Sequence, residues 1–402
     1  MRLILLVAAT AFLLTGVAHA APVTYALTVT NGKLSGPGAD VIHAQLPDAQ
    51  FILYGEDHGF ADSPIVLRAI AREARPLGFH YLVEEVGPLS TQMIRETLKK
   101  NGMEGLHALV HDVPLGIPFL SLKDDALLAS DYLGEDARGT PHLWGVDQEF
   151  IGSPPFHLKR LVALAPNDVA RAATQKLLDE ERAAAVTADQ QKFLLVRSHD
   201  ADFDALSAQF SGSGEAQSII ADLKESAAIY QLWMSGHNYE NNARRARLLA
   251  KNFLADYSTA ADLQPKVVFK MGIEHLMLGT TTINTIDLGT LATEMARIHD
   301  KTALRIAFLP TGGQNVAFEP KSGNPVSVEN YKGEEAAAFF PAIGIDPAKL
   351  SKDSWTLIPM EPIRQSLDTK GMEKLSAMSR CILLGYDYVI TTPNAKPGVS
   401  LY

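Results

Sequence analysis

Two histidines of this chain follow a glycine by three residues: Gly55 precedes His58, and Gly272 precedes His275. Each pair comes directly after an apolar run that is typical of a buried strand. A glycine at this point lets the backbone turn sharply and approach a ligand closely. An imidazole with carboxylates nearby can take a proton from water or hold a metal ion. The repeated pattern therefore indicates a functional site, provided that the fold brings the two histidines together.

Acidic residues occupy the same kind of position elsewhere in the sequence. Glu56 lies between the first glycine and its histidine, the pair Glu84 and Glu85 ends a second apolar run, and Asp147 ends a third. In open α/β sheets the ligand site lies at the carboxyl ends of the strands. We therefore expect Glu56 and Glu84 to share one cleft with the two histidines. The sequence leaves open whether Glu84 or Glu85 faces that cleft.

The elements that must position these residues begin with a β-α-β unit. Residues 51–54 and 79–83 are predicted strands, Ser63 is placed to cap the helix between them, and Gly78 is placed to end it. Such a unit starts a parallel sheet. The further predicted strands are 142–146, 266–270, 305–309 and 386–391. The sequence thus predicts an α/β fold with a central, mostly parallel sheet flanked by helices.

Two long segments interrupt the strand pattern. Residues from about 155 to 260 are rich in Ala, Leu, Gln and Arg at helical spacing, which predicts a helical insertion between two strands. Residues 312–347 contain several Gly, Pro and Lys and are predicted to be a long loop region, forming a rim or lid. We expect residues 21–402 to form a single domain.

The first residues have the pattern of an export signal. Arg2 is followed by an apolar run that closes on Ala18-His19-Ala20, which predicts cleavage after Ala20 and a periplasmic or secreted protein. No later apolar run approaches the roughly 20 residues of a membrane span, so none is expected after cleavage. The formal charge of −10 is spread along the chain and argues against a nucleic-acid partner. Cys381 is the only cysteine, which excludes an internal disulfide.

With these motifs the chain resembles the superfamily that includes erythromycin esterases, Tiki-type proteases and ChaN-like haem-uptake proteins. The segment 144–147 is similar to the esterases' Gly-aromatic-Asp segment, and the segment 245–252 resembles their Arg-Asp-x-x-Met-Ala-x-Asn helix. Ala246 stands where that helix has an aspartate, so a carboxylate that would orient Arg245 is expected to be missing. A single residue, Asp57, separates Glu56 from His58, as in the ChaN-like and Tiki-like branches, whereas the esterases usually have two.

The resemblance implies an exported hydrolase in which water attacks an ester or amide carbonyl of a small-molecule or peptide substrate. His58 would be the general base and Glu56 would orient it. His275 and Arg245 would stabilise the oxyanion, and Glu84 would hold water or ligand.

Two alternatives stay open at this point. In a metal-dependent variant, His58, His275 and Glu56 would hold a divalent metal that activates water. In a ChaN-like alternative, the same histidines would bind haem or a metal complex without turnover. A third, weaker interpretation is a scaffold whose residues no longer act together. Serine-hydrolase chemistry has no support, because no serine lies in a G-x-S-x-G motif.

Overall fold

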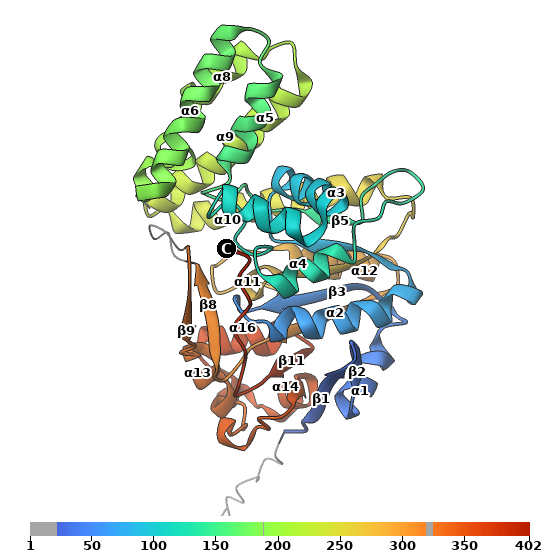
Figure 1. Cartoon of the computed structure of the whole chain (residues 1–402). Helices are drawn as coiled ribbons and strands as arrows, with labels where there is room; N and C mark the ends of the chain where they lie inside the picture. Colours follow the sequence, from blue (N-terminus) through green and yellow to red (C-terminus); the bar gives the residue numbers. More distant parts are fainter. Residues whose placement is uncertain (1–21, 188, 319–324) are drawn as a thin grey trace, which may run out of the picture.

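A nine-stranded sheet forms the centre of the computed structural model, which describes residues 22–187, 189–318 and 325–402 (Figure 1). The strand order is β2-β1-β10-β11-β7-β3-β6-β4-β5. From β11 to β5 all neighbours are parallel, while β10, β1 and β2 form an antiparallel edge. The bounds are β1 Tyr25–Thr30, β2 Lys33–Ser35, β3 Ala49–Glu56, β4 Phe79–Glu84, β5 Leu143–Gly145, β6 Lys266–Gly272, β7 Thr302–Phe308, β10 Trp355–Pro359 and β11 Tyr388–Thr391.

The central strand β3 shows why the apolar runs of the sequence form this sheet. All eight of its residues are buried, with Phe51 and Leu53 packed on one face and Ile52 and Tyr54 on the other. A parallel strand covered on both faces must be apolar on both, which gives a continuous apolar run rather than an alternation. The mostly parallel sheet and the strands expected from such runs are confirmed.

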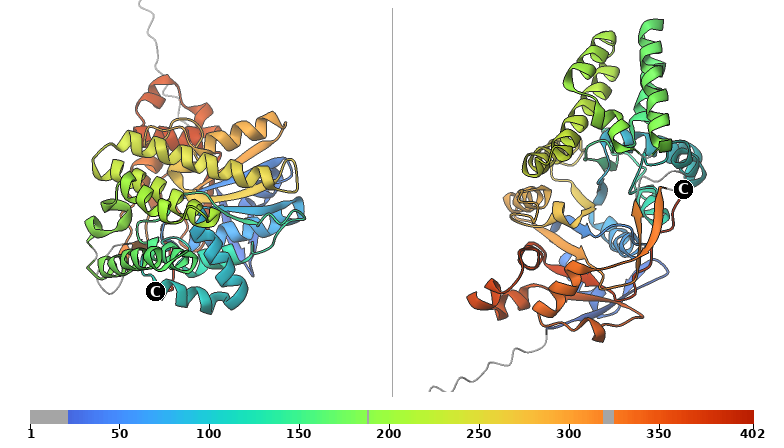
Figure 2. Two further views of the ribbon diagram at one scale, coloured as in Figure 1. Left: turned by 90° about the horizontal axis from the view of Figure 1, so that it is seen from above. Right: turned by 90° about the vertical axis from the view of Figure 1, so that its left-hand side faces the viewer.

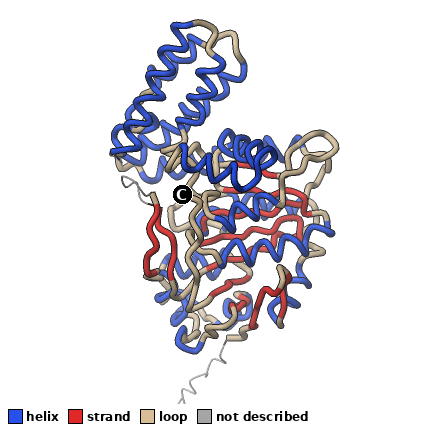
Figure 3. The backbone as a smooth tube through the Cα atoms, viewed as in Figure 1, coloured by secondary structure: helices blue, strands red, loops and turns tan. Residues whose placement is uncertain are grey.

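Helices cover both faces of the sheet (Figure 3). The helices α1 to α4 pack with one face in one apolar cluster. The opposite face packs against α10 and α12, and farther along against α13, α14 and α16. The bounds are α1 Pro37–Gln45, α2 Asp62–Ala74, η1 Arg75–Leu77, α3 Pro88–Asp112, α4 Lys123–Ser130, α11 Ile273–Leu276, α12 Leu288–Ile298, α13 Glu334–Ala342, η3 Pro347–Lys349, α14 Glu361–Ser366, α15 Thr369–Glu373 and α16 Ala377–Gly385.

The helical insertion lies between β5 and β6, as expected. Its helices from α5 to α9 have an apolar cluster of their own and stand beyond one end of the sheet (Figure 2). The chain then returns along α10, which packs on the sheet. The bounds are α5 Pro154–Leu164, α6 Asp168–Thr187, η2 Gln190–Lys192, α7 Leu194–Arg197, α8 Asp200–Gln209, α9 Gly214–Met234 and α10 Asn238–Thr259.

Two local predictions were wrong. The segment 312–347 is largely regular: β8 Gln314–Phe318 pairs with β9 Val326–Asn330, and α13 follows. The side chains of β8 and β9 are mostly half-exposed or exposed, and such a two-stranded sheet resembles a loop in sequence. Ser63 does not cap α2, which begins at Asp62, because its hydroxyl donates instead to the carboxylate of Glu56.

The predicted signal sequence, residues 1–20, lies outside the described residues. In the described part of the chain, no helix combines the length and the apolar composition that a bilayer crossing requires.

Candidate active site

The register of the sheet brings the two glycine–histidine motifs together. Strands β3 and β6 are parallel neighbours, and Glu56 pairs with Gly272 at their carboxyl ends. Both histidines line one cavity of about 460 Å³ at this edge. The other residues that line it are Glu56, Asp57, Glu85, Val86, Gly87, Ser90, Gly116, Pro118, Phe119, Asp147, Gln148, Phe150, Tyr230, Arg245, Gly272, Ile273 and Glu274.

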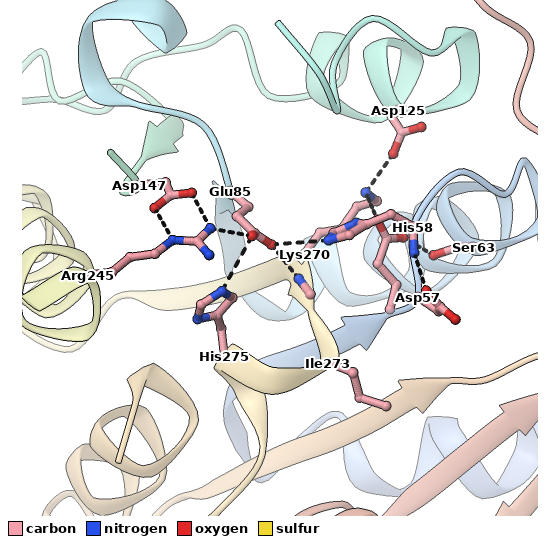
Figure 4. Close-up of polar contacts among 12 residues, drawn as sticks. Asp57, His58, Ser63, Glu85, Asp125, Asp147, Arg245, Lys270, Ile273 and His275 are labelled. Atoms are coloured by element: carbon pink, nitrogen blue, oxygen red, sulfur yellow. Dashed lines mark hydrogen bonds and ion pairs between the residues drawn. The ribbon is translucent and has the colours of Figure 1, made fainter. Parts of the chain in front are cut away.

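His58 presents one ring nitrogen to a buried carboxylate and the other to the cavity. Its Nδ1 lies 3.0 Å from Oε1 of Glu56, and its Nε2 lies 3.6 Å from Oε2 of Glu85 (Figure 4). Phe119 stacks on the ring with centroids 4.2 Å apart. Burial lowers the pKa of His58, but the hydrogen bond to Glu56 and the charge of Glu85 outweigh it and raise that pKa. The imidazole is thus fixed in orientation and made more basic.

Glu56 is held as a carboxylate below His58. Its Oε1 accepts a hydrogen bond of 2.6 Å from Nζ of Lys270, and its Oε2 accepts one from the Ser63 hydroxyl. Burial opposes ionisation of Glu56, but the charge of Lys270 and the hydrogen bond from His58 lower its pKa to about 2. Glu56 therefore carries a negative charge at neutral pH.

Of the neighbours Glu84 and Glu85, it is Glu85 that lines the cavity. Glu85 accepts hydrogen bonds from Nη2 of Arg245 at 2.7 Å and from the backbone N–H of Gly272 at 2.5 Å. Burial would raise the pKa of Glu85, but the charges of His275, His58 and Arg245 hold it well below its usual range. The prediction of Glu84 as the ligand-facing residue is therefore corrected by one position.

Glu84 is buried away from the cavity. It pairs with Lys270 across β4 and β6, and its Oε1 has no hydrogen-bond partner among the described residues. Burial raises the pKa of Glu84 well above its usual range, which favours the neutral form of the side chain. Successive residues of a strand point to opposite faces, which separates Glu84 from Glu85.

His275 lies between two carboxylates. Its Nδ1 is 2.8 Å from Oδ2 of Asp287, the residue that caps α12, and its Nε2 is 3.4 Å from Oε1 of Glu85. Burial and the charge of Arg245 lower the pKa of His275, but the two carboxylates outweigh them and raise it to about 10. His275 is therefore an imidazolium at neutral pH.

Arg245 reaches the same cavity from α10. Its Nε and Nη2 donate to the two carboxylate oxygens of Asp147 at 2.9 and 2.6 Å. The expectation that Arg245 lacks an orienting carboxylate was wrong, because Asp147, just after β5, supplies one and Glu85 a second. The hydrogen bonds of Arg245 to Asp147 and Glu85 use Nε and Nη2. In Figure 4 no dashed line joins the third guanidinium nitrogen to the residues drawn.

Four residues predicted from the sequence, Glu56, His58, Arg245 and His275, line the cavity. Lys270 was not predicted, although a lysine at the end of the buried run 266–270 is a signal of an ionic partner. In the sequence, Asp287 is an aspartate just before an apolar helix, a position typical of an ordinary helix-capping residue. Phe119 gives no signal at all, since it lies in an irregular segment between α3 and α4.

The side chains at the cavity do not fit a site in which His58, His275 and Glu56 bind a metal. Both ring nitrogens of His275 face carboxylates, Nδ1 at 2.8 Å from Asp287 and Nε2 at 3.4 Å from Glu85. No cluster of three His, Cys, Asp or Glu side chains in the described ranges is arranged around a metal position. Phe119 stacks on the face of the His58 ring, and Oε2 of Glu85 lies 3.6 Å from Nε2 of His58.

Comparisons with known proteins agree on the fold. No family model and no curated protein matches the chain. Among solved structures, a mutant of the erythromycin esterase EreC in its open conformation matches with a TM-score of 0.55 and 14% identity over 89% of this chain and 94% of that one. A protein from Bacillus cereus matches with a TM-score of 0.55 and 11% identity, and a succinoglycan biosynthesis protein with 0.52 and 10%; both cover 94% of this chain and 96% of their own. The chain therefore has the fold of the erythromycin esterases.

Proposed function

We propose that this protein is a hydrolase of the erythromycin-esterase type, in which water attacks an ester or amide carbonyl. The observation that carries the proposal is the His58–Glu56 pair at the cavity wall. The side chain of Glu56 is 4% exposed and bonded to Nδ1, whereas His58 is 30% exposed and turns Nε2 to the side of Glu85. A buried carboxylate on Nδ1 fixes the tautomer in which Nε2 has the free lone pair.

In the proposed reaction, Nε2 of His58 takes a proton from water as the water oxygen bonds to the carbonyl carbon. Glu56 stabilises the imidazolium that forms. The guanidinium of Arg245 and the imidazolium of His275 stabilise the negative charge on the carbonyl oxygen. His58 then returns the proton to the departing oxygen or nitrogen as the carbon–heteroatom bond breaks, which gives an acid and an alcohol or amine.

The cavity wall supports a substrate with an apolar part. The aromatic side chains of Phe119, Phe150 and Tyr230 line it, and Val86 and Ile273 add aliphatic surface. Small-molecule and peptide substrates both meet this description. We also propose the wider kinship with Tiki-type and ChaN-like proteins, on the ground of the single residue between Glu56 and His58.

The experiment uses purified protein that begins at residue 21, assayed with p-nitrophenyl esters of increasing acyl length, peptide amides and erythromycin. We expect hydrolysis of at least one ester, abolished in His58→Asn. His111→Asn, which changes an exposed histidine on α3, is the matched control and should retain the activity. Colourless protein without hydrolysis of any ester or amide would contradict the proposal, and a Soret band without turnover would replace it with the haem-binding alternative.

We further propose that the protein is exported and acts in the periplasm or outside the cell. Intact-mass measurement of protein produced from the full sequence should give a chain that starts at Ala21. A cytoplasmic product that retains residues 1–20 would contradict this part of the proposal.

A further inference from the structure

Lys270 is a buried residue of the candidate site. Burial opposes its charged form, but nearby carboxylates raise its pKa well above its usual value, which favours the charged form. Its side chain is 2% exposed, and Nζ lies 2.6 Å from Oε1 of Glu56 and 2.6 Å from Oδ1 of Asp125. Three elements bring these groups together: β6 carries Lys270, β3 carries Glu56 and α4 carries Asp125. Glu84 of β4 lies opposite Lys270 in the register and is the third carboxyl group nearby.

Such an arrangement is costly as a purely structural device. Both ion-pair partners of Lys270 are buried, so three charged groups have lost their water. An apolar side chain of similar length would fill the same place in the core without that cost. The cluster therefore calls for a role that an apolar residue cannot perform.

The role follows from the oxygen that Lys270 contacts. Oε1 of Glu56 accepts from Nζ of Lys270 and faces Nδ1 of His58 at 3.0 Å, while the other oxygen is bonded to Ser63. Lys270 and Ser63 thus hold the Glu56 carboxylate from two sides in the position from which it meets His58. Asp125 holds Nζ of Lys270 from the far side.

We propose that Lys270 is a positioning residue, which fixes the Glu56 carboxylate against Nδ1 of His58 so that Nε2 can act as the base. This inference rests on the proposed hydrolase function. Lys270 itself does not line the cavity, so it does not contact substrate. The charge of Lys270 is also the main favourable influence that lowers the pKa of Glu56, in agreement with this role.

A double-mutant cycle tests the proposal with the best ester substrate. The proteins are the wild type, Lys270→Met, Glu56→Gln and the double variant. Arg305→Met serves as a control, because it breaks another largely buried ion pair, with Asp387, away from the cavity. We expect Lys270→Met to lower kcat by about tenfold or more with KM nearly unchanged. In the Glu56→Gln background it should cause no further loss, whereas Arg305→Met should lower the melting temperature but not kcat.

Equal losses of kcat from Lys270→Met in both backgrounds would overturn the proposal, and so would unchanged kcat in the wild-type background. If Lys270→Met does not fold, Lys270→Met with Asp125→Leu removes the buried pair together and should show the same loss of kcat. His58→Asn separates the two hypotheses. Activity that survives in His58→Asn refutes the hydrolase mechanism itself, whereas activity that depends on His58 but not on Lys270 refutes only the positioning role.

Discussion

Nε2 of His275 lies 3.4 Å from Oε1 of Glu85. The other oxygen of the same carboxylate lies 3.6 Å from Nε2 of His58, so the Glu85 side chain lies between the two imidazoles. The two histidines follow different strands, β3 and β6. Glu85 also accepts a hydrogen bond from Arg245. This carboxylate therefore sets the relative positions of His58, His275 and Arg245.

Glu85→Gln is expected to lower kcat/KM of ester hydrolysis by about 10- to 100-fold, because it removes the charge that holds His275 and Arg245. Glu84→Gln should have a much smaller effect, since Glu84 lies outside the cavity and burial raises its pKa, which favours the neutral form. Steady-state kinetics of the two variants side by side provides the measurement. A larger loss in Glu84→Gln would restore the assignment made from the sequence.

The activity should rise with pH, because His58 must lose its proton to act as a base. Its pKa is raised from 6.5, with burial opposed by Glu56 and Glu85, so the midpoint of the kcat/KM profile should lie above 6.5. In Glu85→Gln the midpoint should move to lower pH, since a negative charge beside the imidazolium is lost. A midpoint that stays in place or moves upward would show that another group controls the profile.

His275 should stabilise the fold in a pH-dependent way. Its pKa is raised from 6.5 to about 10 in the folded protein, so its contribution is complete below 6.5 and is lost as the pH rises towards 10. The size is a few kcal/mol by order of magnitude. Urea unfolding of His275→Gln and wild type should therefore differ more at pH 6 than at pH 10. A difference that is independent of pH would disprove the imidazolium assignment.

Gly272 should be required for catalysis rather than for folding. Its φ of −53° and ψ of 143° suit any residue, but an added Cβ would lie 3.1 Å from Nε2 of His58 and 3.2 Å from Oε2 of Glu85. We expect Gly272→Ala to lower kcat by about tenfold, because small displacements of reacting groups are costly, with little change in melting temperature. Gly214→Ala is the matched control, since nothing lies within 4 Å of its added Cβ. Full activity in Gly272→Ala would contradict the geometry of the site.

Sequence patterns predicted the centre of the fold but not its edge. The parallel strands are buried on both faces, and their apolar runs are unmistakable. The edge strands β1 and β2 have half-exposed residues and therefore lack a continuous apolar run. The strand β10 can be identified only from its pairing with β1 and β11, which are distant in sequence. Pairing between segments hundreds of residues apart leaves no local signal.

The site residues that could be predicted from the sequence are those that directly follow an apolar strand. The spacing from glycine to histidine identified His58 and His275. The choice between Glu84 and Glu85 depends on where β4 ends, because successive side chains of a strand point to opposite faces of the sheet. Asp147 was recognised at a strand end, yet its bond to Arg245 spans 98 positions of the sequence. Such long-range partners become visible only when the strands are placed side by side.

The position of β3 between β6 and β7 also governs how the chain can fold. Residues 49–56 cannot pair with either neighbouring strand until residues 266–308 have been synthesised. Strand β1 likewise cannot pair with β10 until residues 355–359 have been synthesised. Contacts this distant in sequence slow folding. A newly made chain would thus remain open during synthesis, which is the state that the proposed export through a channel for unfolded polypeptides would require.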